Sequence, residues 1–320
     1  MMHALLLTGG TGFVGGALLD RLLSDCRYSP VVAVRRQICS FRSGLKTMEV
    51  GDISGVTNWQ NALAGVKVVV HAAARAHVLS EESSDPLYEF RRVNVEGTLS
   101  LARQAVDSGV ERFIFLSSIG VNGNITARPF TEDDIPDPKE SYAISKYEAE
   151  LGLRELSKET GMQLVIIRPP LVYGPNAPGN FNRLIRAVDS GVPLPLGCIN
   201  NQRSLVALDN LVDLIVTCID HPAAANQTFL VSDGEDLSTT ELLRRMATAL
   251  GKPARLLPVP SWLLEAGASM LGKKALSQRL CGSLQVDISK TRELLGWTPP
   301  LSVDAALRKT AAHFLEHRTH

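Results

Sequence analysis

The first part of the chain alternates short apolar runs with stretches that have helical periodicity. Residues 4–7 form an apolar run, and residues 8–12 then interrupt every regular pattern with three glycines. After this break Val14, Leu18 and Leu22 recur at a spacing of four, as on one face of a helix. The pattern predicts a buried strand, a glycine turn and a helix.

The same alternation of predicted strands and helices continues to about residue 170. Apolar runs predict further strands at 31–34, 48–50, 66–70, 113–116 and 163–167. Helices are predicted at 57–64, around Asn94 and on to about 109, and at 141–161. Residues 122–140 are rich in Pro, Asp, Asn and Gly and predict a loop. Strands that alternate with helices are typical of an α/β fold with an open parallel sheet.

The alternation becomes looser after residue 175. Helices are predicted at 181–191, 211–219 and 238–250, and strands within 201–210 and at 228–232. We therefore divide the chain into residues 1–175, which bind a dinucleotide, and residues 176–320, which mainly form a substrate lobe. The later strands of the first domain are expected to recur near 200–235. Residues 261–271 predict a helix that caps the core of the lobe, with a membrane surface as the less favoured alternative.

Composition limits the class of function. Lys+Arg and Asp+Glu both number 33, and this net charge of zero argues against nucleic acid as the main partner. No apolar stretch approaches the about 20 residues that a membrane span requires, and the short N-terminal apolar run does not resemble a signal peptide. Five cysteines without metal-ligand spacing predict reduced thiols, no metal site and a cytoplasmic location.

The glycine turn has the features of a site for a pyrophosphate. Backbone N–H groups at the start of a helix attract an anion, and glycines let it approach the backbone closely. The glycines at 9, 12 and 15 differ from the G-x-G-x-x-G spacing, and a tight strand–helix corner is the alternative reading. The expected cofactor-binding residues in this turn are Gly9, Thr11, Gly12, Phe13, Val14 and Gly15.

The nature of the cofactor is suggested by the end of the second predicted strand. Arg35 and Arg36 follow it, where an acidic residue would bind the ribose 2′-hydroxyl of NAD. Arginine pairs with a 2′-phosphate, so NADP(H) is favoured and NAD(H) is possible, unless the two arginines are an ordinary surface pair. Asp52, beside Ile53, would accept from the adenine amino group or cap the next helix.

A tyrosine and a lysine four residues apart are the candidate catalytic pair. Tyr142 and Lys146 project from one face of a predicted helix, and Ser118 ends a predicted strand. A tyrosine with its usual pKa of about 10 is a poor acid–base group at neutral pH, and a nearby ammonium lowers that pKa. Ser118 would hydrogen-bond the reacting oxygen. The Tyr-x-x-x-Lys spacing is a weak signal alone, and the order of the motifs strengthens it.

Together these motifs resemble the extended short-chain dehydrogenase/reductases that modify nucleotide sugars. The resemblance implies a doubly wound parallel sheet (Rossmann fold) with a smaller C-terminal α/β substrate lobe. It implies Ser118, Tyr142 and Lys146 as the catalytic group, with Asn94 placing the lysine. The motifs are TGGTGFVG (8–15), GD (51–52), HAAA (71–74), NVEGT (94–98), FLSS (115–118), YAISK (142–146), RPPLVYGP (168–175) and VDISKTRELLGWTP (286–299).

The resemblance also implies further binding residues. Asn180 and Arg203 are similar in placement to residues that meet the diphosphate of the substrate. A homodimer through the helix of Tyr142 is expected. The sequence departs from the family at Asn122, where a tyrosine is frequent, and at Arg35-Arg36. The remaining residues expected to contact the cofactor are Ile53, Ala72, Ala73, Ala74, Pro169, Tyr142 and Lys146.

The expected cofactor favours one reaction. An epimerase returns its hydride to the same sugar and can retain NAD, whereas a reductase exchanges its cofactor, and NADPH suits net reduction. We therefore expect reduction of a UDP-linked 4-keto-6-deoxy-N-acetylhexosamine in surface-polysaccharide (O-antigen) synthesis, a step that rests on the resemblance alone. The alternatives are a 4-epimerase of UDP-hexoses or UDP-N-acetylhexosamines with bound NAD, a reductase of a non-sugar ketone such as a steroid, and a non-enzymatic NADP(H) sensor.

Overall fold

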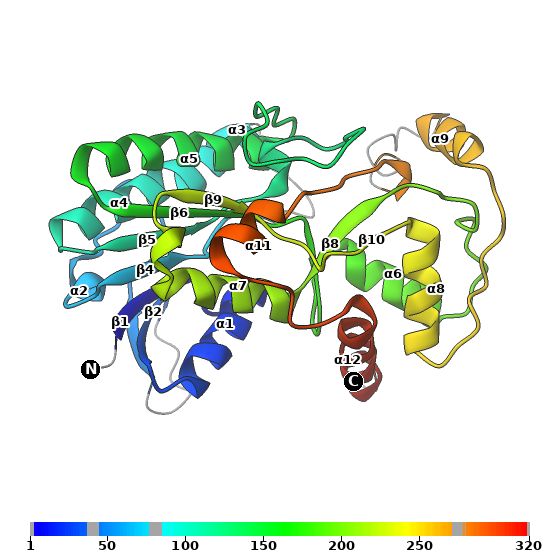
Figure 1. The fold of residues 1–320 in the computed structure, drawn as a ribbon, viewed down its shortest axis with the longest axis horizontal. Coiled ribbons are helices and arrows are strands. Elements are labelled where there is room, and N and C mark those ends of the chain that lie inside the picture. Colours follow the sequence, from blue (N-terminus) through cyan, green and yellow to red (C-terminus); the bar gives the residue numbers. More distant parts are fainter. Residues whose placement is uncertain (1–2, 37–44, 77–84, 271–277, 279, 319–320) are drawn as a thin grey trace.

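The computed structural model describes residues 3–36, 45–76, 85–270, 278 and 280–318. Cys39 and the final residue of the helix predicted at 261–271 lie outside these ranges. Seven parallel strands form the main sheet in the order β3-β2-β1-β4-β5-β6-β9 (Figure 1). They are β1 (His3–Thr8), β2 (Tyr28–Val34), β3 (Lys46–Glu49), β4 (Val68–His71), β5 (Arg112–Leu116), β6 (Gln163–Arg168) and β9 (Gln227–Leu230). The predicted doubly wound sheet is confirmed, and its order reverses between β1 and β4.

The apolar run of β1 is explained by helices on both faces of the sheet. Leu5, Leu6 and Leu7 have no exposed surface, because a parallel sheet of this kind is covered on both sides. Leu5 and Leu7 join one core cluster and Leu6 joins the other, as alternating strand side chains must. The first predicted strand therefore lies at the centre of the molecule.

Helices cover the two faces as separate layers (Figure 1). One layer contains α1 (Phe13–Ser24), α7 (Leu208–Asp220) and α11 (Ser289–Leu295). The other contains α2 (Gln60–Leu63), α4 (Gly97–Asp107) and α5 (Ser141–Thr160). The helix predicted at 57–64 is thus shorter than expected, whereas α5 closely follows its predicted range.

The predicted helix around Asn94 is built from three pieces. They are α3 (Pro86–Arg91), a π-helical turn η1 (Arg92–Glu96) and α4. π-helical turns occur frequently at functional sites. Gly97 begins α4 where a Cβ would lie 2.4 Å from Cγ2 of Ile53, so glycine lets the segment after β3 approach the helix.

A second, smaller unit has its own sheet and core. Its strands are β7 (Leu171–Tyr173), β8 (Arg203–Ala207) and β10 (Asp236–Leu237), in the order β10-β8-β7. Its helices are α6 (Asn180–Asp189), α8 (Thr239–Ala249) and α12 (Val303–Glu316). Phe181, Leu243 and Leu307 share its core. The chain returns from β8 through α7 to β9 in the main sheet, while the predicted division at residue 175 stays a prediction.

Short elements also lie between the main helices and strands. They are the 3-10 turns η2 (Ile119–Val121) and η3 (Pro222–Ala224) and the helix α9 (Ser261–Met270). Residues 122–140 contain no helix or strand, and the backbone of Phe130 pairs with that of Gln285 and Asp287. The loop after β5 therefore lies along a late segment of the chain.

The interpretation of α9 as a core-capping helix is wrong for most of its length. Trp262 is 67% exposed and Met270 is 90% exposed, while Leu264 packs against the core of the second unit. Large apolar side chains of this helix therefore face solvent, and only part of it contacts the core. Among the helices that the structure describes, none is both long and apolar enough to cross a membrane.

Candidate active site

The glycine turn between β1 and α1 requires its glycines. Gly9 has a φ of +74°, and a Cβ there would lie 2.7 Å from the backbone N of Ala73. A Cβ on Gly15 would lie only 2.1 Å from the carbonyl oxygen of Gly9. The backbone N–H of Gly12 donates to that same oxygen at 2.9 Å. The turn is therefore tight, and it brings the chain after β4 against the start of α1.

The start of α1 fits a pyrophosphate. Its N-cap is Gly12, which has no side chain to bond the first-turn N–H groups, and no acidic residue lies in that turn. These donors and the helix dipole favour an anion. Phe13 and Val14 direct their side chains into the core, so their backbone is what remains for a ligand, and Thr11 is exposed.

A buried histidine fixes the strand ends behind this turn. His71 is 1% exposed, and its Nδ1 and Nε2 lie 2.8 Å and 2.9 Å from the hydroxyls of Thr8 and Thr98. Burial and the nearby Lys146 lower the pKa of His71 to about 3. The backbone N of Ala73 donates to the Thr8 hydroxyl at 3.2 Å. His71 is thus a neutral histidine held by two hydrogen bonds, and we assign it a structural role.

The two arginines that follow β2, Arg35 and Arg36, differ in their contacts. Nε of Arg35 lies 2.8 Å from Oδ1 of Asp52, and both side chains are about three-quarters exposed. Arg36 is exposed. The Asp52 carboxylate therefore binds Arg35 and does not cap α2, whose N-cap is Trp59. Ile53 packs against the core.

The predicted catalytic residues lie on or beside the first turns of α5. Tyr142 is half-buried and its ring meets Phe90 edge-on, with 6.1 Å between centroids. Nζ of Lys146 lies 3.8 Å from the centroid of Phe115, near the end of β5. A Cβ on Gly120 would lie 3.4 Å from Oγ of Ser118 and 3.1 Å from Cβ of Ala143, the residue after Tyr142. The structure thus places Ser118 beside the first turn of α5.

Burial dominates the titration of the tyrosine–lysine pair. It raises the pKa of Tyr142 to about 12. It lowers the pKa of Lys146 to about 7, against the opposing effect of the Glu150 carboxylate. The expected lowering of the Tyr142 pKa is therefore not found in this structure. The reason is that Lys146 is itself buried against Phe115, so its positive charge is only partly present at neutral pH.

Asn94 contacts α5 at Ser145, the residue before Lys146. It is buried, and its Nδ2 donates to Oγ of Ser145 at 3.0 Å and to the carbonyl of Arg75 at 3.1 Å. The backbone N of Arg75 donates to its Oδ1 at 2.9 Å. The Ser145 hydroxyl in turn donates to the carbonyl of Tyr142 at 2.7 Å. Asn94 thus contacts the first turn of α5 through Ser145, and its predicted role in placing Lys146 stays a prediction.

The structure also shows residues near the site that the sequence reasoning missed. Glu150 is buried one turn after Lys146 and forms an ion pair with Arg168, at the end of β6. Nη2 of Arg168 lies 2.5 Å from Oε2 of Glu150, and both side chains are at most 3% exposed. The spacing Lys146-x-x-x-Glu150 was the available signal, because it repeats the four-residue spacing of Tyr142 and Lys146.

The predicted substrate residues lie in the second unit. Asn180 is the first residue of α6, and Arg203 on β8 donates to the carbonyl of Gly282 at 3.0 Å. Pro169 is buried, and its carbonyl accepts from the backbone N of Ile119 at 3.0 Å. Pro169 therefore fixes the turn that follows Ser118, and its predicted cofactor contact stays a prediction.

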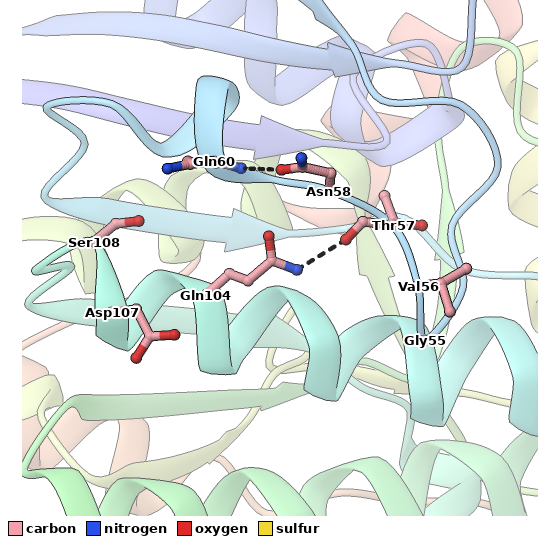
Figure 2. A pocket seen from close by; sticks show the side chains of 8 residues that line it. All are labelled: Gly55, Val56, Thr57, Asn58, Gln60, Gln104, Asp107 and Ser108. Atoms are coloured by element: carbon pink, nitrogen blue, oxygen red, sulfur yellow. Dashed lines mark hydrogen bonds between the residues drawn. The ribbon is translucent and has the colours of Figure 1, made fainter.

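A separate hollow of about 460 Å³ lies between α4 and the segment before α2 (Figure 2). It is lined by Gly55, Val56, Thr57, Asn58, Gln60, Gln104, Asp107 and Ser108. The Gln104 amide is already engaged, since its Nε2 donates to the carbonyl of Thr57 at 2.8 Å. The hollow contains no predicted site residue. Within the described residues, no group of three metal-ligating side chains could hold an ion.

Comparison with known proteins decides the family. Residues 5–232, which include the glycine turn, Ser118, Tyr142 and Lys146, match the NAD dependent epimerase/dehydratase family. The chain belongs to this family. This membership agrees with the resemblance that the motifs indicated.

Similar proteins act on sugars linked to a diphosphate. The chain is 50% identical over 319 residues to a UDP-glucose 4-epimerase of Vibrio cholerae, covering 99% of this chain and 97% of that protein. It is 28% identical over 331 residues to an N-acetyl-alpha-D-glucosaminyl-diphospho-ditrans,octacis-undecaprenol 4-epimerase of Escherichia coli O157:H7, covering 99% and 97%. Both relatives are thus named as 4-epimerases, although the carrier of the sugar differs between them.

Solved structures agree with the fold. A UDP-glucose 4-epimerase from Thermotoga maritima with UDP-glucose has a TM-score of 0.78 at 22% identity, covering 98% of this chain and 99% of that one. A UDP-glucuronic acid 4-epimerase from Bacillus cereus in complex with NAD has a TM-score of 0.79 at 21% identity, covering 98% and 99%.

Proposed function

We propose that the protein is a 4-epimerase of a UDP-hexose or UDP-N-acetylhexosamine that works with bound NAD. The observation that carries this is the 50% identity, over almost the whole chain, to a UDP-glucose 4-epimerase. The placement of Ser118, Tyr142 and Lys146 around the ends of β5 and α5 supports it. This reading replaces the 4-keto reduction that the sequence favoured as the first candidate.

The chemistry assigns one task to each residue. Tyr142 takes the proton of the sugar C4 hydroxyl, and Ser118 hydrogen-bonds the same oxygen as it becomes a carbonyl. Lys146 supplies the positive charge that stabilises the phenolate. Removal of the C4 hydride and its return are the chemistry that a bound NAD would supply. Tyr142 would give the proton back to the C4 oxygen when the opposite face of the sugar is presented, so that the C4 epimer forms without net oxidation.

Binding of the nucleotide is assigned to residues of both units. The backbone at Gly9, Gly12 and Gly15 would hold the cofactor pyrophosphate, which fits their close approach and the uncapped start of α1. Asn180 and Arg203 would meet the diphosphate of the UDP-sugar, and arginine can bind a phosphate with two parallel hydrogen bonds. We further propose a homodimer through α5 and a cytoplasmic location.

The second candidate is the NADPH-dependent 4-reductase of a UDP-4-keto-6-deoxy-N-acetylhexosamine in O-antigen synthesis. The observation that favours it is the absence of a carboxylate at the end of β2, where Arg35 and Arg36 stand. Two arginines suit a 2′-phosphate and hence NADPH. The pairing of Arg35 with Asp52 weakens this argument, because it already engages one of the two guanidinium groups.

A single assay separates the two candidates. The purified protein is incubated with UDP-glucose, and separately with UDP-N-acetylglucosamine, without added cofactor, and the products are separated chromatographically. An epimerase forms UDP-galactose or UDP-N-acetylgalactosamine with no net change in absorbance at 340 nm. A reductase converts neither, and instead consumes NADPH when UDP-4-keto-6-deoxy-N-acetylglucosamine is supplied. The epimerase proposal fails if neither UDP-sugar is converted.

A further inference from the structure

A buried carboxylate lies one helical turn from the catalytic lysine. Lys146 is 1% exposed, and Glu150 has no exposed surface. Residues four apart on a helix project from the same face, so this carboxylate and the ammonium lie on one side of α5. A charge that is removed from water needs compensation, and the Glu150 carboxylate contributes to it by its electrostatic effect on Lys146.

Glu150 also joins α5 to two strands of the main sheet. Its carboxylate accepts from Nε of Arg168 at 3.0 Å and from Nη2 at 2.5 Å. The hydroxyl of Ser117 donates to its Oε1 at 2.5 Å. Arg168 ends β6, and Ser117 immediately precedes Ser118. One side chain therefore connects the helix of Tyr142 and Lys146 with the backbone that presents Ser118.

Asn122 completes this network from the loop after β5. It is 2% exposed, its Oδ1 accepts from Nη1 of Arg168 at 3.0 Å, and its Nδ2 donates to the carbonyl of Thr131 at 2.8 Å. This is the position where the family frequently has tyrosine. The asparagine is explained by its two hydrogen bonds, which complete the partners of a buried guanidinium and fix the loop.

We propose that Glu150 is a positioning residue for the reaction, which balances the charge of Lys146 and, through Arg168 and Ser117, fixes α5 against Ser118. The proposal rests on the proposed function and adds a residue outside the Ser118, Tyr142 and Lys146 group. Without this carboxylate the buried ammonium has less opposing charge, so Lys146 loses its proton at lower pH. Neutral lysine no longer stabilises the phenolate.

Other charged or titratable groups around Lys146 do not replace Glu150. His71 from β4 is neutral, since burial lowers its pKa to about 3. Tyr142 on the same helix is a neutral phenol with its pKa raised to about 12. Arg168 from β6 and Arg154, which is 4.0 Å from Glu150, are both cations. Glu150 is therefore the anion of this group.

Three variants test the proposal. Glu150→Gln keeps the shape and removes the charge. Glu150→Gln combined with Arg168→Gln removes both charges, so that no buried guanidinium is left without a partner if the single variant fails to fold. Glu148→Gln is the matched control, because its carboxylate lies on the same helix and pairs with Arg91 at the surface.

Two readouts are made for each variant. The first is the titration midpoint of Lys146, followed by NMR of protein with ¹³C-labelled lysine and assigned with Lys146→Arg, which needs no catalysis. The second is the pH profile of kcat and KM with the UDP-sugar. We expect the midpoint to fall by about one pH unit in Glu150→Gln. The pH at which kcat declines on the alkaline side should fall together with the midpoint. Above the midpoint kcat should therefore be about tenfold lower, while KM stays unchanged.

The outcomes separate the inference from the proposed function. The paired variant should shift the midpoint in the same direction by less, and Glu148→Gln should leave both readouts unchanged. The role of Glu150 is overturned if folded Glu150→Gln has the same midpoint and the same kcat profile as the wild type. If Glu150→Gln does not fold, the paired variant is judged by the same criterion. If the wild type converts no UDP-sugar but the midpoint falls, the epimerase proposal fails and the charge balance stands.

Discussion

The ammonium of Lys146 lies 3.8 Å from the centroid of the Phe115 ring, in a position with almost no exposure to solvent. A cation over an aromatic face is stabilised by the ring, but less than it is by water. The pKa of Lys146 is accordingly lowered to about 7. The positive charge on which the chemistry of Tyr142 depends is therefore sensitive to small changes near it.

Removing the phenolic hydroxyl tests the assignment of the general base. Tyr142→Phe should lower kcat by about 10²- to 10⁴-fold, because a positioned acid–base group contributes that much. The half-buried ring is retained, so the melting temperature should stay near that of the wild type. The measurement is the rate of UDP-sugar conversion together with a thermal melt.

Tyr147→Phe is the control for this change, since Tyr147 lies on the same helix and is also half-buried. It should leave kcat within the error of the wild type. Equal activity of Tyr142→Phe and Tyr147→Phe would remove Tyr142 from the reaction.

Two neighbouring glycines of α1 should respond oppositely to alanine. In Gly15→Ala the new methyl group would lie 2.1 Å from the carbonyl of Gly9, so the turn must distort and cofactor binding should be lost. In Gly16→Ala the methyl group would lie 3.6 Å from the carbonyl of Gly10, an ordinary contact. Alanine is the better helix former, so this variant should be stabilised by up to about 1 kcal/mol.

The measurements are thermal melting and fluorescence titration with NAD and NADP⁺. Loss of binding in Gly16→Ala, or wild-type binding in Gly15→Ala, would contradict the packing of the turn.

The buried histidine predicts a pH dependence of stability. The native pKa of His71 is about 3, below the usual histidine value of 6.5, so the unfolded chain binds the extra proton between these values. Stability from this group is complete above pH 6.5 and falls as the pH decreases towards 3, with a slope of up to about 1.4 kcal/mol per pH unit. Urea unfolding between pH 4 and 7 measures this slope.

His71→Gln should flatten that slope, although it also lowers stability by breaking the contacts with Thr8 and Thr98. His317→Gln is the control, because His317 is exposed near the end of the described chain. A slope that stays the same in His71→Gln would show that His71 does not remain neutral in the folded protein.

The pair of Arg35 and Asp52 predicts how cofactor choice can be changed. Asp52→Asn removes the carboxylate that holds Arg35, so affinity for NADP⁺ should rise while affinity for NAD stays similar. Arg35→Ser with Arg36→Ser should lower the affinity for NADP⁺ about tenfold or more, as expected when a hydrogen-bonded charge is lost. Titration calorimetry with both cofactors gives the ratio. Parallel changes in both affinities would mean that the arginines do not approach the 2′-position.

Much of the fold was predictable because the pattern of each strand and helix lies in residues that are neighbours in the sequence. Apolar runs such as residues 4–7 gave the strands, and the doubly wound order followed from the resemblance of the motifs. The helix α9 was misjudged because helical periodicity shows which residues share a face and does not show whether that face is covered. Trp262 is consequently exposed where the pattern suggested burial.

The arrangement of the candidate site residues was predictable, and their electrostatics were less so. Tyr142 and Lys146 lie on one face of α5, as their spacing indicates. The contribution of burial to their pKa values depends on packing that no spacing contains, and it proved larger than the effect of the pair on each other. The pairing of Glu150 with Arg168 joins residues 18 positions apart, and a match between two charges at that separation cannot be recognised in one sequence.

The fate of the hydrogen at C4 tests the central claim most directly. UDP-glucose that carries deuterium at C4 is incubated with the purified protein, without added cofactor, and the UDP-galactose formed is analysed by mass spectrometry and NMR. Return of the hydride to the same sugar predicts UDP-galactose that keeps deuterium at C4. UDP-N-acetylglucosamine with deuterium at C4 is tested in the same way. Formation of neither UDP-galactose nor UDP-N-acetylgalactosamine, or of product whose deuterium has been lost, would contradict epimerisation by Tyr142 and a retained NAD.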